Sequence, residues 1–325
     1  MEYLERPADP LSDVLVLLKP VSYFAGGFVV PDGTAVSWPK HSGIKCYAVI
    51  SGQCWLTVET VPGPVLLSDG DCFLLPRGLP FSLSTDLSLT PMDFFSFKDS
   101  LKALMAPAPP ENGGRYIVGG YFGVTGGPAE ELLSALPPIV HIRKETDKTT
   151  MRWSLECMRQ ELTSPQPGGK IIAQQLAYMM LVQALRLHMA EGAKGGVGWF
   201  FALADKQMNS AIAAMHDQPG YPWTLQSLAR SVGMSRSAFA QRFKQTVGST
   251  PMEYLTRWRM LLAADRLKRT SDSVSSIALS LAYDSESAFS KAYRRVMGCS
   301  PRSSRNQNDA LPPSSPKGHE AVPLY

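Results

Sequence analysis

One segment of the chain occurs twice, at residues 227–251 (SLARSVGMSRSAFAQRFKQTVGSTP) and 276–301 (SIALSLAYDSESAFSKAYRRVMGCSP). Around the start of the first copy, apolar residues over 225–232 recur at the i, i+3, i+4, i+7 spacing of an amphipathic helix. Gly233 then breaks the pattern, since glycine adopts a positive φ at little cost, and Ser235 can cap a following helix through its hydroxyl. The repeat therefore predicts two helix-turn-helix units.

The second helix of the first unit, expected over 235–247, is anchored by Phe239 and Phe243. Its other face carries short or hydrogen-bonding side chains suited to a DNA major groove. For one unit alone, a helical pair with a solvated basic face is an equally good explanation. In the second unit Phe289 and Tyr293 stand at the corresponding positions. A duplicated basic pair is hard to explain by core packing, so the repeat favours nucleic-acid binding.

A single helix is expected to join the two units. Thr250 is its expected N-cap and Pro251 its first residue. With about 18 residues it would be roughly 27 Å long. Ahead of the first unit, Asp205 is expected to cap a helix over 206–216.

The charge of the chain is divided by region. Residues 221–305 contain 14 Lys and Arg against 5 Asp and Glu, a net charge of +9, whereas residues 1–205 contain 16 against 20, a net charge of −4. A field of one sign concentrated in a small segment attracts polyanions, and nucleic-acid affinity rises as such charges displace condensed counterions. The charge pattern thus supports a nucleic-acid partner for the repeat.

The N-terminal sequence has no basic segment before a long apolar core, and its apolar run over 14–18 is far shorter than the ~20 residues that span a bilayer. We therefore expect neither export nor a membrane anchor. The five cysteines form no C-x-x-C pair. They fit free thiols in a reducing cytoplasm better than a disulfide framework.

Over 21–124 short apolar segments alternate with turns built on Gly, Pro and Asp, which predicts a β-sandwich or barrel. Helices are expected next over 129–138, 151–164 and 170–191. The last has a broad apolar stripe, for which core packing is the default explanation and a dimer interface the alternative. The expected strands cover 22–30, 44–51, 53–60, 65–68, 72–76, 81–84, 92–97 and 115–124.

With these features the chain resembles the AraC family of bacterial transcription regulators over roughly residues 206–305. The resemblance lies in the linking segment YLTRWRMLLAADRLKR, the S-x-SAF core and the G-x-(S/T)-P closure of both units. It implies that residues around the aligned phenylalanines face DNA bases, whereas basic residues nearby are phosphate contacts or, equally, surface charges. The implied base contacts are Ser237, Ala240, Gln241, Glu286, Ser287, Ser290 and Lys291, and the implied backbone contacts are Arg236, Arg242, Lys244, Arg294 and Arg295.

Two residues depart from the family pattern in the second unit. Ala282 stands where the family usually has a turn glycine, and Ser304 where an aromatic residue often follows Pro-Arg. Alanine at positive φ would cost about 1 kcal/mol, unless the extra turn residue of this unit relaxes that demand. We therefore expect the first unit to carry more of the sequence reading.

Residues 9–190 resemble the cupin-like sensor domain of one AraC branch, through the strand pair YAVISGQCWL, the segment DGDCFLLPRG and the helices that follow. Metal-binding cupins supply a His-x-His pair and a carboxylate on the first paired strands, and a further histidine after a P-x-G turn. Here Phe81 takes the position of that histidine and His41 stands alone, so no metal or other cofactor is expected. Trp38, Tyr47 and Trp55 are guesses for effector contacts, with aromatic core as the alternative role.

The sequence thus predicts a multidomain protein: an all-β cupin-like barrel with accessory helices over 9–190, a linker over 191–205, an all-α DNA-binding domain over 206–305 and a disordered tail over 306–325. The expected function is a cytoplasmic, nucleoid-associated bacterial regulator that binds double-stranded operator DNA. Its expected partners are a small-molecule effector, a second copy of the chain and, for an activator, RNA polymerase. One alternative is a cupin metalloenzyme with a DNA-binding appendage. The other is an architectural protein whose barrel serves dimerisation alone.

Overall fold

A computed structural model describes residues 9–18, 21–94, 114–123, 133, 136–164, 166–191 and 197–306. The chain divides into two compact units. The barrel unit comprises residues 20–191, and the helical unit comprises residues 1–19 together with 192–325. No helix of the described residues is both long enough and apolar enough to cross a membrane.

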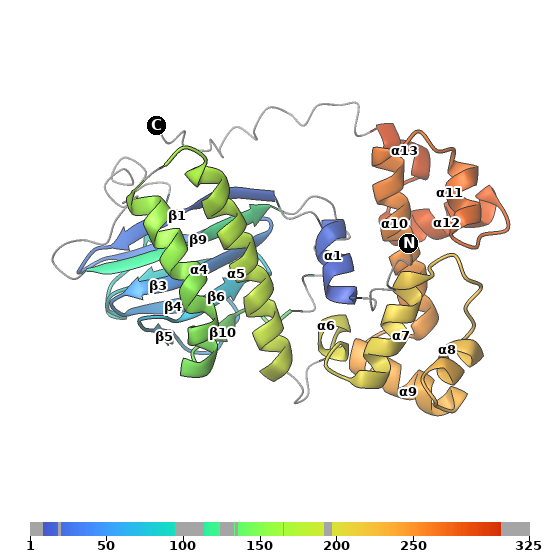
Figure 1. The fold of residues 1–325 in the computed structure, drawn as a ribbon, viewed down its shortest axis with the longest axis horizontal. Coiled ribbons are helices and arrows are strands. Elements are labelled where there is room, and N and C mark those ends of the chain that lie inside the picture. The colour runs from blue at the N-terminus through green and yellow to red at the C-terminus, as the bar shows by residue number, and fades with distance from the viewer. Residues whose placement is uncertain are drawn as a thin grey trace, which may run out of the picture. The chain divides into compact units, whose positions relative to one another are not determined.

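Two sheets form the barrel unit, each with five strands among the described residues (Figure 1). Neighbouring strands are antiparallel, apart from the parallel pair β2 (Ala35–Trp38) and β8 (Met92–Asp93). The first sheet has the order β1 (Val21–Val30), β9 (Arg115–Gly123), β3 (Ile44–Ser51), β6 (Cys72–Leu75) and β10 (Val140–Ile142). The second has the order β5 (Val65–Leu67), β4 (Cys54–Val58), β7 (Phe81–Ser84), β2 (Ala35–Trp38) and β8 (Met92–Asp93).

Alternating side chains of both sheets fill the core of this unit, as expected for strands with two distinct faces. Tyr47 and Val49 on β3 join Leu56 on β4 and Leu83 on β7 in one buried cluster. The predicted sandwich or barrel is confirmed. The short strands β2 and β10 were not expected, because AVSW and VHI offer too few residues for a clear alternation.

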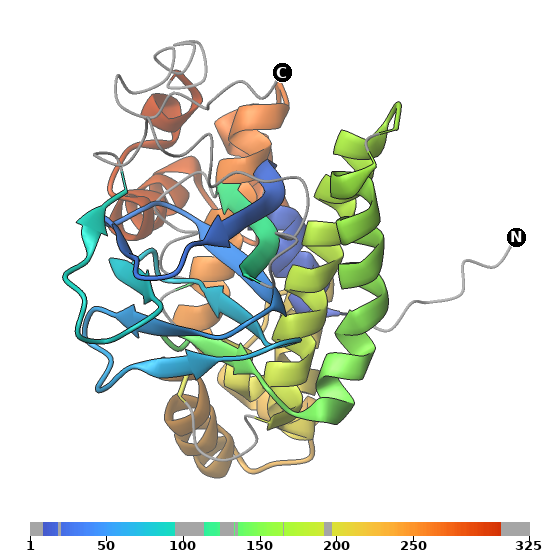
Figure 2. The same cartoon turned by 90° about the vertical axis from the view of Figure 1, so that its left-hand side faces the viewer.

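Two antiparallel helices, α4 (Glu145–Thr163) and α5 (Gly169–Glu191), lie side by side against the first sheet (Figures 1 and 2). Helix α5 packs on the sheet, where Tyr178 meets Phe122 of β9 with ring centroids 6.3 Å apart. Helix α4 begins six residues before its predicted start, because its polar first turn has no apolar periodicity. Most of the helix expected over 129–138 lies outside the described residues.

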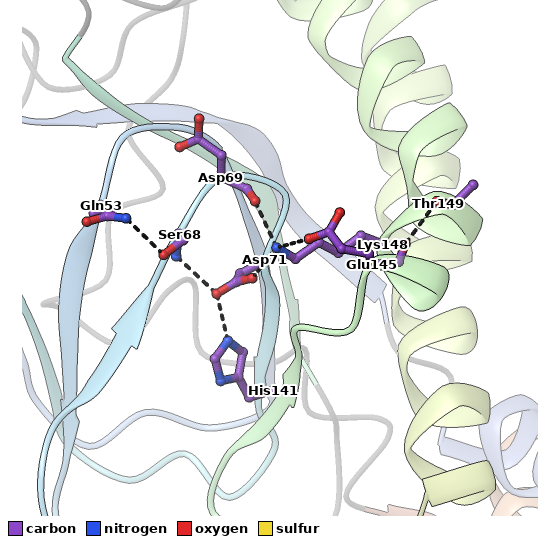
Figure 3. A network of polar contacts seen from close by, with 8 residues as sticks. All are labelled: Gln53, Ser68, Asp69, Asp71, His141, Glu145, Lys148 and Thr149. Carbon is purple, nitrogen blue, oxygen red and sulfur yellow. Dashed lines mark hydrogen bonds and ion pairs between the residues drawn. The ribbon is translucent and has the colours of Figure 1, made fainter.

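A buried carboxylate fastens α4 to the barrel (Figure 3). Asp71, which follows the turn before β6, accepts hydrogen bonds from the Ser68 amide at 3.0 Å and from Nε2 of His141 on β10 at 2.9 Å. Its other oxygen lies 2.9 Å from Nζ of Lys148 on α4, which also contacts Glu145 at 3.0 Å. Burial alone would raise the pKa of Asp71, but these partners outweigh it and hold the pKa below its usual value.

The helical unit contains the repeat (Figure 1). Leu11, Val14 and Leu15 of its N-terminal helix are buried, because that helix packs on α7 (Lys206–Asp217) and α10 (Pro251–Arg269). By its contacts α1 (Pro10–Leu18) therefore groups with the helical unit, although it falls within the range 9–190 expected for the cupin-like domain. The helices of the unit are α1 (Pro10–Leu18), α6 (Trp199–Ala202), α7 (Lys206–Asp217), α8 (Leu225–Ser231), α9 (Arg236–Val247), α10 (Pro251–Arg269), α11 (Val274–Ser280), α12 (Glu286–Met297) and α13 (Pro301–Asn306).

The described end of the expected linker is also part of the helical unit. Helix α6 packs on α9, and the amide of Gly198 donates to the carbonyl of Thr246 at 2.8 Å. Trp199 and Phe200 are buried there, so this aromatic pair serves as core and not as spacer. Of the tail predicted over 306–325, Asn306 is the last residue of α13 and the rest lies outside the described residues.

Candidate nucleic-acid interface

The first helix-turn-helix forms from α8 and α9. Thr224 and Ser227 make a reciprocal capping box at the start of α8, and Leu228 and Ala229 are the buried residues of this helix. Gly233 in the turn has φ +68°, and a Cβ there would meet nothing within 4 Å. The glycine is therefore required by the backbone angle and not by a lack of space.

The orientation of α9 follows from its cap and its two anchors. The Ser235 hydroxyl accepts a hydrogen bond from the Ala238 amide at 3.3 Å, which confirms the predicted cap. Phe239 and Phe243 are fully buried, with ring centroids 5.6 Å apart. Because these rings fix one face of α9 in the core, its opposite face is turned to solvent.

The second unit repeats this construction in α11 and α12. Ser273 caps α11 and Ser285 caps α12. Phe289 and Tyr293 are fully buried at the positions of Phe239 and Phe243. The two recognition helices are therefore equivalent residue by residue, so each exposed position on α9 has a counterpart on α12.

Both departures in the second unit have a physical consequence. Ala282 has φ +59°, so the extra turn residue does not relax the demand for a left-handed backbone, and the strain expected of alanine is present. Ser304 is buried, and the Tyr293 hydroxyl donates to its Oγ at 2.9 Å. A tyrosine in place of the first unit's phenylalanine is thus matched by a serine that satisfies its hydroxyl.

One rigid helix, α10, carries the two units at its ends (Figure 1). Thr250 and Glu253 form the predicted cap as a capping box, and Pro251 is the first helical residue. The helix has 19 residues, so it is about 28 Å long. Arg259 is buried on it and donates to the carbonyls of Pro219 at 2.7 Å and Tyr221 at 2.8 Å. These bonds lock the helix to the loop before the first unit.

The predicted base-contact residues form two matching stripes. On α9, Ser237 and Gln241 are exposed and Ala240 is half-buried between them. On α12 the corresponding positions follow the same order. Ser287 and Lys291 are exposed there, Ser290 and Glu286 are half-buried, and Glu286 lies 3.7 Å from Arg302.

The predicted backbone contacts divide into two kinds. Arg236, Lys244, Arg294 and Arg295 are exposed and form no ion pair with any residue that the structure describes. Arg242 is held instead within the unit. Its guanidinium lies 2.5 Å from Asp205, the N-cap of α7, and 2.9 Å from the Gln207 amide oxygen. We therefore leave Arg242 out of the proposed surface. The sequence did not reveal this pairing, because the partners are 37 residues apart.

Of the three aromatic residues guessed as effector contacts, Trp38 and Tyr47 both pack on Phe28 in one cluster, whereas Trp55 lies apart from them. Trp38 stacks on Phe81 inside the barrel unit, and Tyr47 packs between Phe28 and Phe73. Trp55 lies on the opposite face of β4 from the buried Cys54 and Leu56, so it is not part of that cluster. Over the described ranges, no three His, Cys, Asp or Glu side chains are grouped to hold a metal ion.

Sequence reasoning also missed Lys45, a charged residue whose side chain enters the barrel core. The sequence does mark this residue, because Lys45 is the one charged side chain in the largely apolar strand IKCYAVIS. Such a charge on an inward-facing position is rare in a core and is usually paired.

Two family models match the chain. A cupin model matches residues 9–190 and a helix-turn-helix domain model matches residues 228–307. A putative AraC-like transcription regulator of Streptomyces lividans is 39% identical over 298 residues, which are 90% of this chain and 96% of the relative. The transcriptional regulator AlkR of Acinetobacter baylyi is 31% identical and covers 85% of this chain, with 93% of its own length matched. A crystal structure of the DNA-binding domain of AdpA in complex with a target DNA matches 33% of this chain and 96% of that domain, with 28% identity and a TM-score of 0.31.

Proposed function

The chain belongs to the AraC family of transcription regulators, and from that premise we propose that α9 and α12 read two successive major grooves of one DNA site. The observation that carries this proposal is the pair of equivalent exposed stripes on one rigid helical unit. Successive grooves on one face of B-DNA are ~34 Å apart, somewhat more than the ~28 Å length of α10. The proposed complex therefore contains bent DNA.

Each stripe offers donors and acceptors that suit particular bases. Gln241 on α9 matches the bidentate edge of adenine, and Lys291 on α12 matches the N7 and O6 acceptors of guanine. Glu286 can accept a hydrogen bond from the amino group of cytosine. Ser237, Ala240, Ser287 and Ser290 are small enough to let the backbone of each helix approach the groove.

Phosphate contacts are proposed for the four unpaired basic residues. Arg236 and Lys244 lie on either side of the stripe of α9, whereas Arg294 and Arg295 both follow that of α12. These contacts would hold the protein in register without reading sequence. Their charges also make the affinity for DNA strongly dependent on salt.

For the barrel unit we propose effector binding and homodimerisation. Helix α5 covers its own sheet, yet Ile171 is 64% and Ile172 is 45% exposed near its start, which supports a contact with a second copy there. A regulator of this design would act in the bacterial cytoplasm, at promoters, and would contact RNA polymerase when it activates transcription. The metalloenzyme alternative is not adopted, because relatives that match nearly the whole chain are named as transcription regulators.

Competition binding with the full chain tests the proposal. Fragments of genomic DNA that the protein retains at physiological salt are sequenced, and a labelled duplex from the most enriched site is titrated by fluorescence anisotropy. We expect this site to bind at least ~10³-fold more tightly than a shuffled duplex of the same length and composition. Equal affinity for the two duplexes would contradict sequence-specific recognition.

A further inference from the structure

The Lys45 side chain enters the interior of the barrel unit from β3. Lys45, Tyr47 and Val49 are every second residue of β3, so their side chains share one face of the strand. Tyr47 and Val49 line the buried cluster between the sheets, which makes this the inner face. The residue is 8% exposed. The amino group of Lys45 therefore lies in the core of the barrel unit.

Aromatic rings surround the Lys45 ammonium. Its Nζ lies 4.6 Å from the ring centre of Phe81 and 5.7 Å from that of Trp38, and these rings stack with centroids 4.8 Å apart. Cation–π attraction of this kind offsets part of the desolvation cost of a buried ammonium, but a full offset requires an opposite charge and hydrogen bonds. Burial lowers the pKa of Lys45 to about 7, which reflects the missing opposite charge.

No carboxylate in the described part of the chain forms an ion pair with Lys45. The buried carboxylate of the same unit, Asp71, is already engaged by His141, Lys148 and the Ser68 amide. The interior of the unit therefore holds a cation whose partner is absent from the described residues.

A second polar side chain beside Lys45 has its polar atoms buried and unpaired. Both ring nitrogens of His41 are buried and make no well-formed hydrogen bond with a described group, although the Pro39 carbonyl is close enough to act on the ring. The ring packs 6.0 Å from Phe81 and 6.2 Å from Tyr121. Burial, and then the charge of Lys45, lower the pKa of His41 to about 3, while the Pro39 carbonyl acts in the opposite direction. His41 is therefore neutral at physiological pH and retains one N–H that can donate.

We propose that Lys45 and His41 form the polar end of a binding site for a small organic monocarboxylate, with Trp38 and Phe81 as its apolar wall. The carboxylate would pair with the ammonium and accept the imidazole N–H, so both unsatisfied groups would gain a partner. One cation balances one negative charge, whereas a phosphate dianion would leave a charge unpaired and a neutral sugar would leave the ammonium unpaired. The inference rests on the proposed effector role of the barrel unit and names the class of effector.

The test compares carboxylates with amides of the same shape. Full-length protein is titrated by calorimetry with two acid and amide pairs, benzoate with benzamide and hexanoate with hexanamide. Each ligand is raised to about 20 mM, a range in which weak binding of a small ligand is measurable. We expect at least one carboxylate to bind saturably and to raise Tm by mass action, and its amide to bind at least ~10-fold more weakly.

Two lysine variants separate the site from general electrostatics. Lys45→Met should reduce carboxylate affinity at least ~10-fold, since it removes the charge and keeps the length of the side chain. Lys40→Met, at a nearby exposed lysine, should leave the affinity unchanged. Lys45→Met should also melt no lower than the parent protein without ligand, because it replaces an unpaired buried charge by an apolar group.

Several results would overturn the assignment. These are the absence of binding by both carboxylates, equal binding of acid and amide, or undiminished binding in a folded Lys45→Met protein. His41→Phe provides a second variant, expected to weaken carboxylate binding without loss of the fold. DNA affinity is measured in parallel with the enriched duplex. If carboxylate binds but leaves DNA affinity and transcription unchanged, the site stands and the effector role fails; if DNA binding fails, the carboxylate result is unaffected.

Discussion

Nδ1 of His216 on α7 lies 3.2 Å from a carboxylate oxygen of Asp13 on α1, although the two residues are 203 positions apart. Nε2 of the same ring lies 2.9 Å from the Tyr254 hydroxyl on α10. Because a carboxylate accepts, Nδ1 carries the proton and Nε2 accepts from Tyr254. The neutral imidazole, stacked on Trp258 with centroids 3.7 Å apart, thus joins three helices of the helical unit.

This arrangement predicts that acid weakens the helical unit. Burial lowers the pKa of His216 more than Asp13 raises it, so the folded state favours the neutral ring. The stabilisation is present above the unfolded pKa of about 6.5 and is lost as pH falls toward the lower folded value, at up to about 1.4 kcal/mol per pH unit in that window. Thermal melts between pH 7.5 and 5.5 should show a smaller fall in Tm for His216→Gln than for the parent chain. Parallel profiles would contradict the assignment.

The strained turn of the second unit gives a prediction with an internal control. Ala282→Gly should stabilise the unit by about 0.5 kcal/mol, because relief of left-handed strain exceeds the added entropy of the unfolded chain. Gly233→Ala imposes the same strain on the first unit without a steric clash and should destabilise it by about 1 kcal/mol. Urea denaturation followed by helical circular dichroism measures both changes. Opposite signs are required, and a loss of stability in Ala282→Gly would show that the turn is unstrained.

Removing the charge of Asp71, which fastens α4 to the barrel, should be costly even when the shape of the side chain is kept. Asp71→Asn leaves Lys148 with Glu145 as its remaining carboxylate and should lower the free energy of unfolding by about 2–3 kcal/mol. Asp69→Asn is the matched control, since Lys148 contacts the backbone carbonyl at that position. Because the pKa of Asp71 is lowered, its contribution is present above about pH 4 and is lost as pH falls further. Equal denaturation midpoints for the two variants would argue against a stabilising role of the Asp71 carboxylate.

Two basic residues of α9 should differ in their effect on DNA binding. Lys244→Ala should reduce the slope of log affinity against log salt by about 0.9, the value for one lost phosphate contact. Arg242→Ala should leave that slope unchanged and cost less than about 1 kcal/mol of stability, because its ion pair with Asp205 is partly exposed. Anisotropy titrations at three salt concentrations measure the slopes. A reduced slope for Arg242→Ala would restore that residue to the DNA surface.

The helix-turn-helix units could be predicted from the sequence because their determinants are local. Caps at Ser235 and Thr250, a turn at Gly233 and anchors at Phe239 and Phe243 all lie within a few residues of the element they define. Each of these features has the same meaning in any tertiary setting. They were all confirmed.

The placement of α1 could not be predicted in the same way. An apolar stripe such as Leu11, Val14 and Leu15 requires a partner surface but does not specify which unit supplies it. The same holds for Arg242, whose exposed position on a basic helix resembles a phosphate contact until Asp205 is brought beside it. Long-range pairings of this kind arise from the fold and leave no periodic signal.

The most direct test of the account is selection of bound duplexes from a random library by the full chain and by two variants, Gln241→Ala and Lys291→Ala. We predict a selected site with two conserved segments about 10 base pairs apart. Gln241→Ala should relax preference in one segment and Lys291→Ala in the other, with a cost of about 1–3 kcal/mol for each lost base contact. Weaker binding by both variants with an unchanged selected sequence would contradict base reading by α9 and α12.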